Sequence, residues 1–90
     1  MKKSFSLILM LVVSILLSSN IYYGNLHAHT SYSDGSLYPE DTYDYAKNYV
    51  DIQAITDHAY YFVQLINGKE KPYLTKLAAE KATIPNKFIA

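Results

Sequence analysis

The residues of this chain best suited to chemistry are its histidines and the aspartates near them. His27 and His29 are separated by one residue, Asp34 follows in a polar stretch, and Asp57 and His58 are adjacent further along the chain. If the first two histidines lie on a strand, the two-residue period places both side chains on one face. Their Cα atoms are then about 6.5 Å apart, and two imidazoles at that spacing can bind one divalent cation.

The elements that must position these residues follow from the pattern around them. We predict a strand over 21–30, a loop over 31–38, an amphipathic helix over 39–49 and a second strand over 51–58. Pro39 suits the first position of the helix. A strand, helix and strand in this order form a βαβ unit with a parallel pair and a right-handed crossover.

The βαβ unit explains why the candidate residues should meet. Functional groups gather at the carboxyl ends of strands in parallel α/β sheets. His27 and His29 end the first predicted strand, and Asp57 and His58 end the second. We therefore expect all three histidines and both neighbouring aspartates, including Asp34, to lie at one rim of the sheet as a metal site.

The remainder of the chain continues the α/β pattern. Residues 59–66 are ambiguous between a strand and a short helix, and Asn67-Gly68 predicts a turn. A second helix is expected from Pro72 to about residue 82. Residues 88–90 have the composition of the start of a third strand.

The N-terminus has the composition of a targeting segment. Lys2 and Lys3 precede an apolar run over 5–17, and polarity returns at 18–20. This is the pattern of a secretory signal, and the run is shorter than the roughly 20 residues that span a bilayer. No pair of small residues marks a clear cleavage site, so 1–20 is a signal peptide or an uncleaved N-terminal anchor. We expect an exported protein, periplasmic, extracellular or membrane-anchored, with possible membrane contact through 5–17.

Composition narrows the function of the remaining part, 21–90. The chain has no cysteine, which excludes disulfides and thiolate metal ligands. Its eight basic residues balance eight acidic ones, and all the basic residues are lysines. A nucleic-acid binder would show a stripe of basic residues, usually with arginine, so nucleic-acid binding is not expected. A domain of this size has a core that typically supplies only about 3–5 kcal/mol. A complete multi-substrate enzyme is therefore not expected.

Two stretches together resemble a known family. GNLHAHTSYSDGS (24–36) and DIQAITDHAYYF (51–62) are similar to the PHP domain (polymerase and histidinol phosphatase), and closest to its secreted, metal-dependent phosphoesterase branch. LAAEKATIPNKFIA (77–90) is more weakly similar to the helix and loop that lead into the third strand of that family. The resemblance implies a distorted seven-stranded β/α barrel with two or three divalent metal ions at the carboxyl ends of its strands.

The resemblance also implies roles for the candidate residues. His27 and His29 match the first-motif pair that binds one metal, Asp34 matches the acidic residue that helps hold another, and His58 matches a ligand of that second site. Asp57 is expected beside the ligands, where a carboxylate orients an imidazole. Histidine and carboxylate ligands suit Zn, Mn and Fe alike, and the implied substrate is a small phosphoester.

The sequence also lacks several residues of the family pattern. The family has a later glutamate that bridges two metals, then further histidines, whereas no histidine follows His58 here. Glu70 and Glu80 precede the strand that should carry the bridging glutamate. Tyr60 stands where the secreted branch often has an acidic residue. We therefore expect the chain to be the incomplete N-terminal βαβ(α) portion of such a barrel, inactive alone.

Two other interpretations of the sequence remain open. The first is a small exported module that holds one metal ion without catalysis. The second is a membrane-anchored structural peptide, with 5–17 as the anchor and the tyrosine-rich segments at the membrane surface. Metal binding that is coupled to folding would favour the module.

Overall fold

The computed structural model describes Met10 and residues 21–90. Met10 apart, the predicted signal peptide or anchor at 1–20, with its apolar run at 5–17, lies outside the described residues. Among the described residues, no helix has the length and apolar character required to cross a membrane.

The main sheet is parallel, as the βαβ pattern predicts. β1 (Gly24–Asn25) pairs with β2 (Ile52–Gln53), with Gly24 opposite Ile52 and Asn25 opposite Gln53. On the other side of β2, Ile89 forms a parallel bridge with Ile52. The third strand expected near this point is thus represented by one bridge, and β2 is central.

Both strands are shorter than predicted, and a local hydrogen bond gives the reason. The side-chain oxygen of Asn25 accepts a hydrogen bond from the backbone N–H of His27 at 3.2 Å, and such local bonds compete with a strand ladder. The two chains nevertheless stay together beyond the strands. The N–H of Ala54 donates to Asn25 O at 2.9 Å, and that of Thr56 donates to Ala28 O at 2.7 Å.

The first helix, α2 (Pro39–Ala46), connects the two strands. Proline at its start has a backbone angle that suits a helix, and Glu40 and Asp41 lie in the first turn, where the helix dipole favours carboxylates. Tyr38 precedes the helix without a side-chain cap. Tyr43 is buried against the rest of the domain, so packing stabilises the helix in the absence of a side-chain cap.

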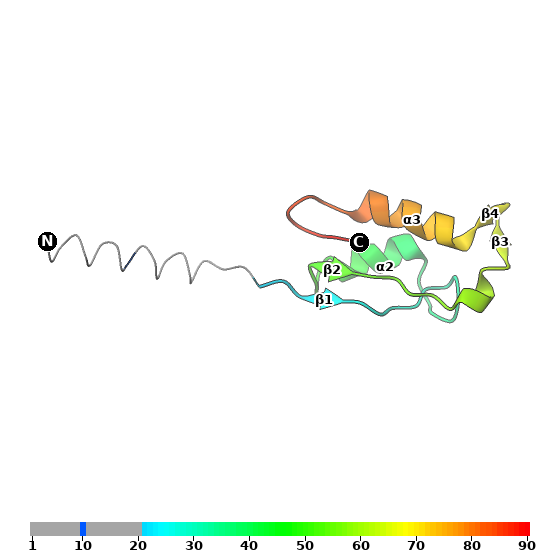
Figure 1. Ribbon diagram of the computed structural model, residues 1–90, viewed down its shortest axis with the longest axis horizontal. Coiled ribbons are helices and arrows are strands. Elements are labelled where there is room, and N and C mark those ends of the chain that lie inside the picture. The colour runs from blue at the N-terminus through cyan, green and yellow to red at the C-terminus, as the bar shows by residue number, and fades with distance from the viewer. Residues whose placement is uncertain (1–9, 11–20) are drawn as a thin grey trace, which may run out of the picture.

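The second long helix, α3 (Lys71–Ala82), lies beside α2 over the same face of the sheet (Figure 1). Pro72 opens it, and the Thr83 hydroxyl donates to Ala79 O at 3.0 Å where it ends. Small alanines on the facing sides allow the helices to approach closely. The buried core consists of Tyr43, Ala46, Ala78, Ala82 and Phe88.

A short hairpin lies at the end of the domain next to the start of α3 (Figure 1). After the short helix η1 (Ala59–Tyr61), β3 (Leu65–Ile66) pairs in antiparallel fashion with β4 (Lys69–Glu70). The predicted turn joins them: Asn67 has φ 51° and Gly68 has φ 76°. Two consecutive positive φ angles are typical of the type I′ turn that asparagine and glycine favour.

The described residues therefore form a mixed α/β structure with two small sheets. The predicted α/β class and βαβ unit are confirmed. Helices cover one face of the β1–β2 sheet, and the carboxyl ends of both strands lead toward the same end of the domain (Figure 1). That end carries the candidate residues.

Candidate metal centre

The loop that follows β1 is organised around Thr30, which is fully buried. Its backbone N–H and its hydroxyl both donate to the Asp57 carboxylate, each at 2.6 Å. The Ser33 hydroxyl donates to the same carboxylate at 2.5 Å. Thr30 O in turn accepts hydrogen bonds from the N–H groups of Ser33 and Gly35 at 3.0 and 2.8 Å. One carboxylate from the second strand segment therefore holds the loop that carries Asp34.

Gly35 is required by close backbone contact within this loop. A Cβ at this position would overlap the His29 carbonyl group and would lie 2.8 Å from Thr30 Cα. Backbone atoms cannot move aside as the end of a side chain can. The absence of a side chain at Gly35 therefore lets the loop fold back and brings Asp34 toward His29.

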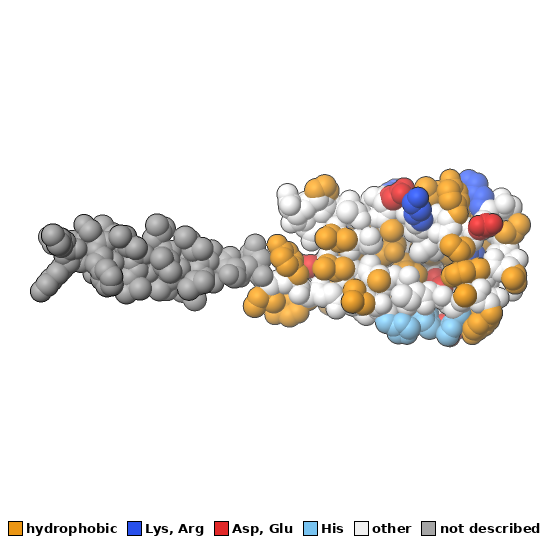
Figure 2. Space-filling view, viewed as in Figure 1, with side chains coloured by type: hydrophobic (Ala, Val, Ile, Leu, Met, Phe, Trp, Pro, Cys, Tyr) orange, Lys and Arg blue, Asp and Glu red, His pale blue; other side chains and the backbone are white. Residues whose placement is uncertain are grey.

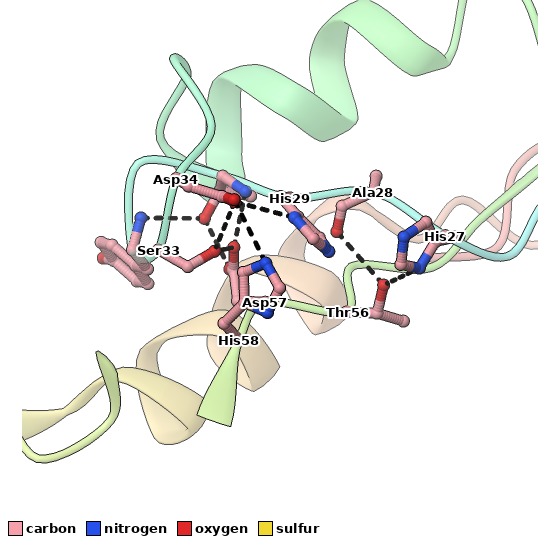
Figure 3. Close-up of polar contacts among 10 residues, drawn as sticks. His27, Ala28, His29, Ser33, Asp34, Thr56, Asp57 and His58 are labelled. Carbon is pink, nitrogen blue, oxygen red and sulfur yellow. Dashed lines mark hydrogen bonds and ion pairs between the residues drawn. The ribbon is translucent and has the colours of Figure 1, made fainter. Parts of the chain in front are cut away.

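Three side chains from two segments of the chain converge at this point. Asp34 Oδ1 is 2.7 Å from His29 Nδ1, and Asp34 Oδ2 is 3.1 Å from His58 Nε2. The rings of His29 and His58 have centroids 4.3 Å apart. Ligand-capable atoms of the three residues all lie within 4.8 Å of one another. Figure 3 shows the aspartate directed toward both imidazoles.

The electrostatics keep the Asp34 carboxylate charged. Desolvation acts to raise the pKa of Asp34, but the hydrogen bond with His29 and the positive charge available on His58 and His29 outweigh it. The pKa of Asp34 therefore lies below its ordinary value. At neutral pH this residue offers anionic oxygen atoms at the surface of the domain.

His27 lies beside this group and is not part of it. Its ring centroid is 4.7 Å from that of His29, so the two predicted neighbours do lie together, but its ligand atoms are outside the three-residue cluster. His27 Nδ1 is instead 2.8 Å from the hydroxyl oxygen of Thr56. Figure 3 shows His27 on the side of His29 away from Asp34, and Figure 2 shows the histidines together along one edge of the surface.

Asp57 has a different role from the one expected. We predicted that it would orient an imidazole, whereas the hydrogen bonds of its carboxylate in the described structure go to Thr30 and Ser33. It acts on the site by shaping the loop of Asp34. The reason is that three donors of this loop lie within hydrogen-bond distance of its carboxylate, namely the N–H and hydroxyl of Thr30 and the hydroxyl of Ser33.

Two further residues frame the cluster. Lys71, at the start of α3, is buried and donates to Tyr32 O at 2.9 Å and to Gln64 Oε1 at 3.0 Å, so it ties the same loop to the hairpin region. The ring of Tyr60 stacks on that of His58, with centroids 5.0 Å apart. An aromatic ring therefore borders His58 on this side of the cluster.

The donor set fits a divalent cation of the zinc, manganese or iron type. In each contact between Asp34 and an imidazole, two atoms with lone pairs share one proton, and a cation that binds these atoms would displace that proton. Two imidazoles and one carboxylate are ligands that these metals share. Three protein ligands also leave coordination positions open, as in catalytic metal sites.

Sequence reasoning missed four residues that build the site: Thr30, Ser33, Thr56 and Lys71. The first three had a detectable signal, because each is adjacent to a predicted ligand or to its neighbour and carries a hydroxyl. Lys71 had none, since nothing in its sequence surroundings indicates a buried amine bound to a loop about forty positions earlier.

Comparison with known proteins adds no relative. No family model, no curated protein and no solved structure matches this chain.

Proposed function

We propose that this exported chain carries the first metal-binding motifs of a PHP-type, metal-dependent phosphoesterase, with His29, Asp34 and His58 holding a divalent cation. The convergence of these three side chains from the loop after β1 and the segment after β2 carries the proposal. The pairing of an H-x-H…S-D-G stretch with a T-D-H stretch supports the family. The basic and apolar N-terminal pattern supports export.

The arrangement of the residues suits phosphoester chemistry. A bound divalent ion would supply positive charge that polarises a phosphoryl group and activates water. The chain itself supplies orientation: Asp57 holds the loop of Asp34, and in the metal-free chain Asp34 holds the ring of His29 through Nδ1. His29 and His58 are partly exposed, with 22% and 37% of their side-chain surface accessible. A small phosphoester can therefore reach the cluster from solvent.

Calorimetric titration of the full chain with Zn²⁺ or Mn²⁺ tests the metal site. We expect stoichiometric binding with release of protons, because the cation replaces protons shared by Asp34 and the imidazoles. Proton release is measured by repeating the titration in buffers of different ionisation enthalpy. Asp34→Asn should weaken metal binding by at least about 10-fold. Removing a residue that only hydrogen-bonds to a metal ligand already lowers the affinity by about this factor, and Asp34 is a proposed ligand itself.

Asp44→Asn is the matched control, since Asp44 lies on the exposed surface of α2 and pairs with Lys47. It should bind metal as the unaltered chain does. Equal affinity for the unaltered chain and Asp34→Asn would contradict the proposed site.

One observation favours a second candidate, a metal-binding module without catalysis. Tyr60 stacks on His58 and contributes no carboxylate. Hydrolysis of p-nitrophenyl phosphate by the metal-loaded chain, lost in His58→Ala, supports the phosphoesterase. Stoichiometric binding with no hydrolysis above that of the metal-free chain favours the module.

A further inference from the structure

The position of Thr56 next to His27 has a specific consequence for metal binding. His27 is excluded from the three-residue cluster, yet its ring lies beside that of His29. Its Nδ1 atom is 2.8 Å from Thr56 Oγ1. We propose that Thr56 is a positioning residue that accepts the Nδ1 proton of His27 and so keeps His27 Nε2 unprotonated and free to bind a cation. This inference rests on the proposed metal-binding function.

The backbone around Thr56 fixes the position of its side chain next to His27. The N–H of Thr56 donates to Ala28 O at 2.7 Å, which fixes the residue against the first strand segment. The Thr56 hydroxyl has the same carbonyl at 3.5 Å as an acceptor. In the proposed arrangement the hydroxyl proton points to Ala28 O, and the hydroxyl oxygen accepts the Nδ1 proton of His27.

The neighbouring histidine also has an oxygen acceptor at Nδ1. His29 Nδ1 lies 2.7 Å from Asp34, but that contact belongs to the proposed metal cluster, where the cation would replace the shared proton. For His27 the contact to Thr56 leaves Nε2 for a ligand. Metal-binding histidines usually donate their second ring N–H to a protein acceptor, which fixes the tautomer and the ring orientation. Free neutral histidine in water favours the opposite tautomer, with the proton on Nε2, so His27 needs such a partner.

The tautomer can be measured without any metal. Long-range ¹H–¹⁵N correlation spectra of the full chain, labelled with ¹⁵N-histidine and recorded at pH 8, report which ring nitrogen carries the proton. We expect a protonated Nδ1 for His27 in the unaltered chain and in Thr56→Ser, which keeps the hydroxyl. Thr56→Val has nearly the same shape without the hydroxyl, and it should shift His27 toward the Nε2–H form.

Zinc supplies the second measurement. On addition of Zn²⁺, the Nε2 resonance of His27 should shift in the unaltered chain, and Thr56→Val should weaken the binding reported by His27 by about 10-fold or more. Thr42→Val is the matched control, because the Thr42 hydroxyl donates to Tyr38 O at the start of α2, outside the cluster. It should change neither the tautomer nor the affinity.

The outcomes separate the two proposals. A protonated Nε2 on His27 in the unaltered chain, or an unchanged tautomer in Thr56→Val, overturns the role of Thr56. If the tautomer depends on Thr56 but no titration detects zinc binding, Thr56 sets the tautomer of His27, but the proposed metal function fails and with it the role of Thr56 in metal binding. If His29 and His58 respond to zinc and His27 does not, the proposed function stands and the role of Thr56 in binding is refuted.

Discussion

Removal of the Asp57 carboxylate should test how the site loop is held. Asp57→Ala deletes the acceptor for both donors of Thr30, which is fully buried. Each buried donor left without a partner costs about 1–3 kcal/mol, so these two donors together account for about 2–6 kcal/mol. The Ser33 hydroxyl is half-buried and can turn to water, so we assign it no additional cost.

This loss of stability should abolish cooperative folding. A core of this size typically supplies about 3–5 kcal/mol, so the expected cost is similar to the whole stability of the domain. Urea denaturation followed by circular dichroism and tyrosine fluorescence measures the free energy of unfolding. We expect Asp57→Ala to show no cooperative transition at 25 °C.

Asp57→Asn distinguishes loss of charge from loss of shape. The asparagine carbonyl can still accept from the N–H of Thr30, and the Thr30 hydroxyl can rotate to accept from the new amide. Because hydrogen bonds to a charged acceptor are about twice as strong as neutral ones, we expect a loss of about 1–2 kcal/mol with the fold retained. Asp44→Asn, on the exposed surface of α2, is the control. A free energy of unfolding for Asp57→Ala within about 0.5 kcal/mol of the unaltered chain would refute the reasoning.

Three other substitutions test features of the fold and the site. Gly35→Ala should destabilise the chain by about 1–3 kcal/mol and weaken zinc binding, because the added methyl group overlaps backbone atoms of the loop; urea denaturation and calorimetry measure both effects. Ser31→Ala should raise the free energy of unfolding by about 1 kcal/mol, because the buried Ser31 hydroxyl has no hydrogen-bond partner among the described residues. Burial, followed by the charge of Asp57, raises the pKa of Tyr43 above its ordinary value. The stability that depends on neutral Tyr43 is therefore complete below pH 10 and is lost as the pH rises further, by at most about 1.4 kcal/mol per pH unit. In Tyr43→Phe, urea midpoints measured between pH 9 and pH 11 should fall less steeply.

For each of these three substitutions, one result would contradict the prediction. Gly24→Ala is the control for Gly35, since a Cβ there would lie 3.4 Å from Ile52 Cβ; equal stability of both variants would show that the loop does not need its glycine. A lower stability for Ser31→Ala would indicate that its hydroxyl is satisfied in solution. An unchanged pH dependence in Tyr43→Phe would mean that Tyr43 ionises alike in the folded and unfolded chain.

The sequence by itself determined the order of the elements and the identity of the metal-binding candidates. Local rules were enough to predict the helix starts near Pro39 and Pro72 and the turn at Asn67-Gly68, because these features depend on neighbouring residues. The parallel pairing of the two strands could be predicted because it depends on chain direction. His27 and His29 lie next to each other as predicted, although β1 ends at Asn25 and neither residue is in the strand.

Only the tertiary structure decided which of the candidates touch one another. The direction in which Asp34 points depends on how its loop folds back, and that depends on Thr30, Gly35 and a carboxylate more than twenty positions away. Hydrogen bonds between distant segments leave no periodic trace in a sequence, so the separation of His27 from the cluster and the role of Asp57 could not be predicted. The residues that can bind a cation are a local property of the chain, whereas their convergence is a property of the packed fold.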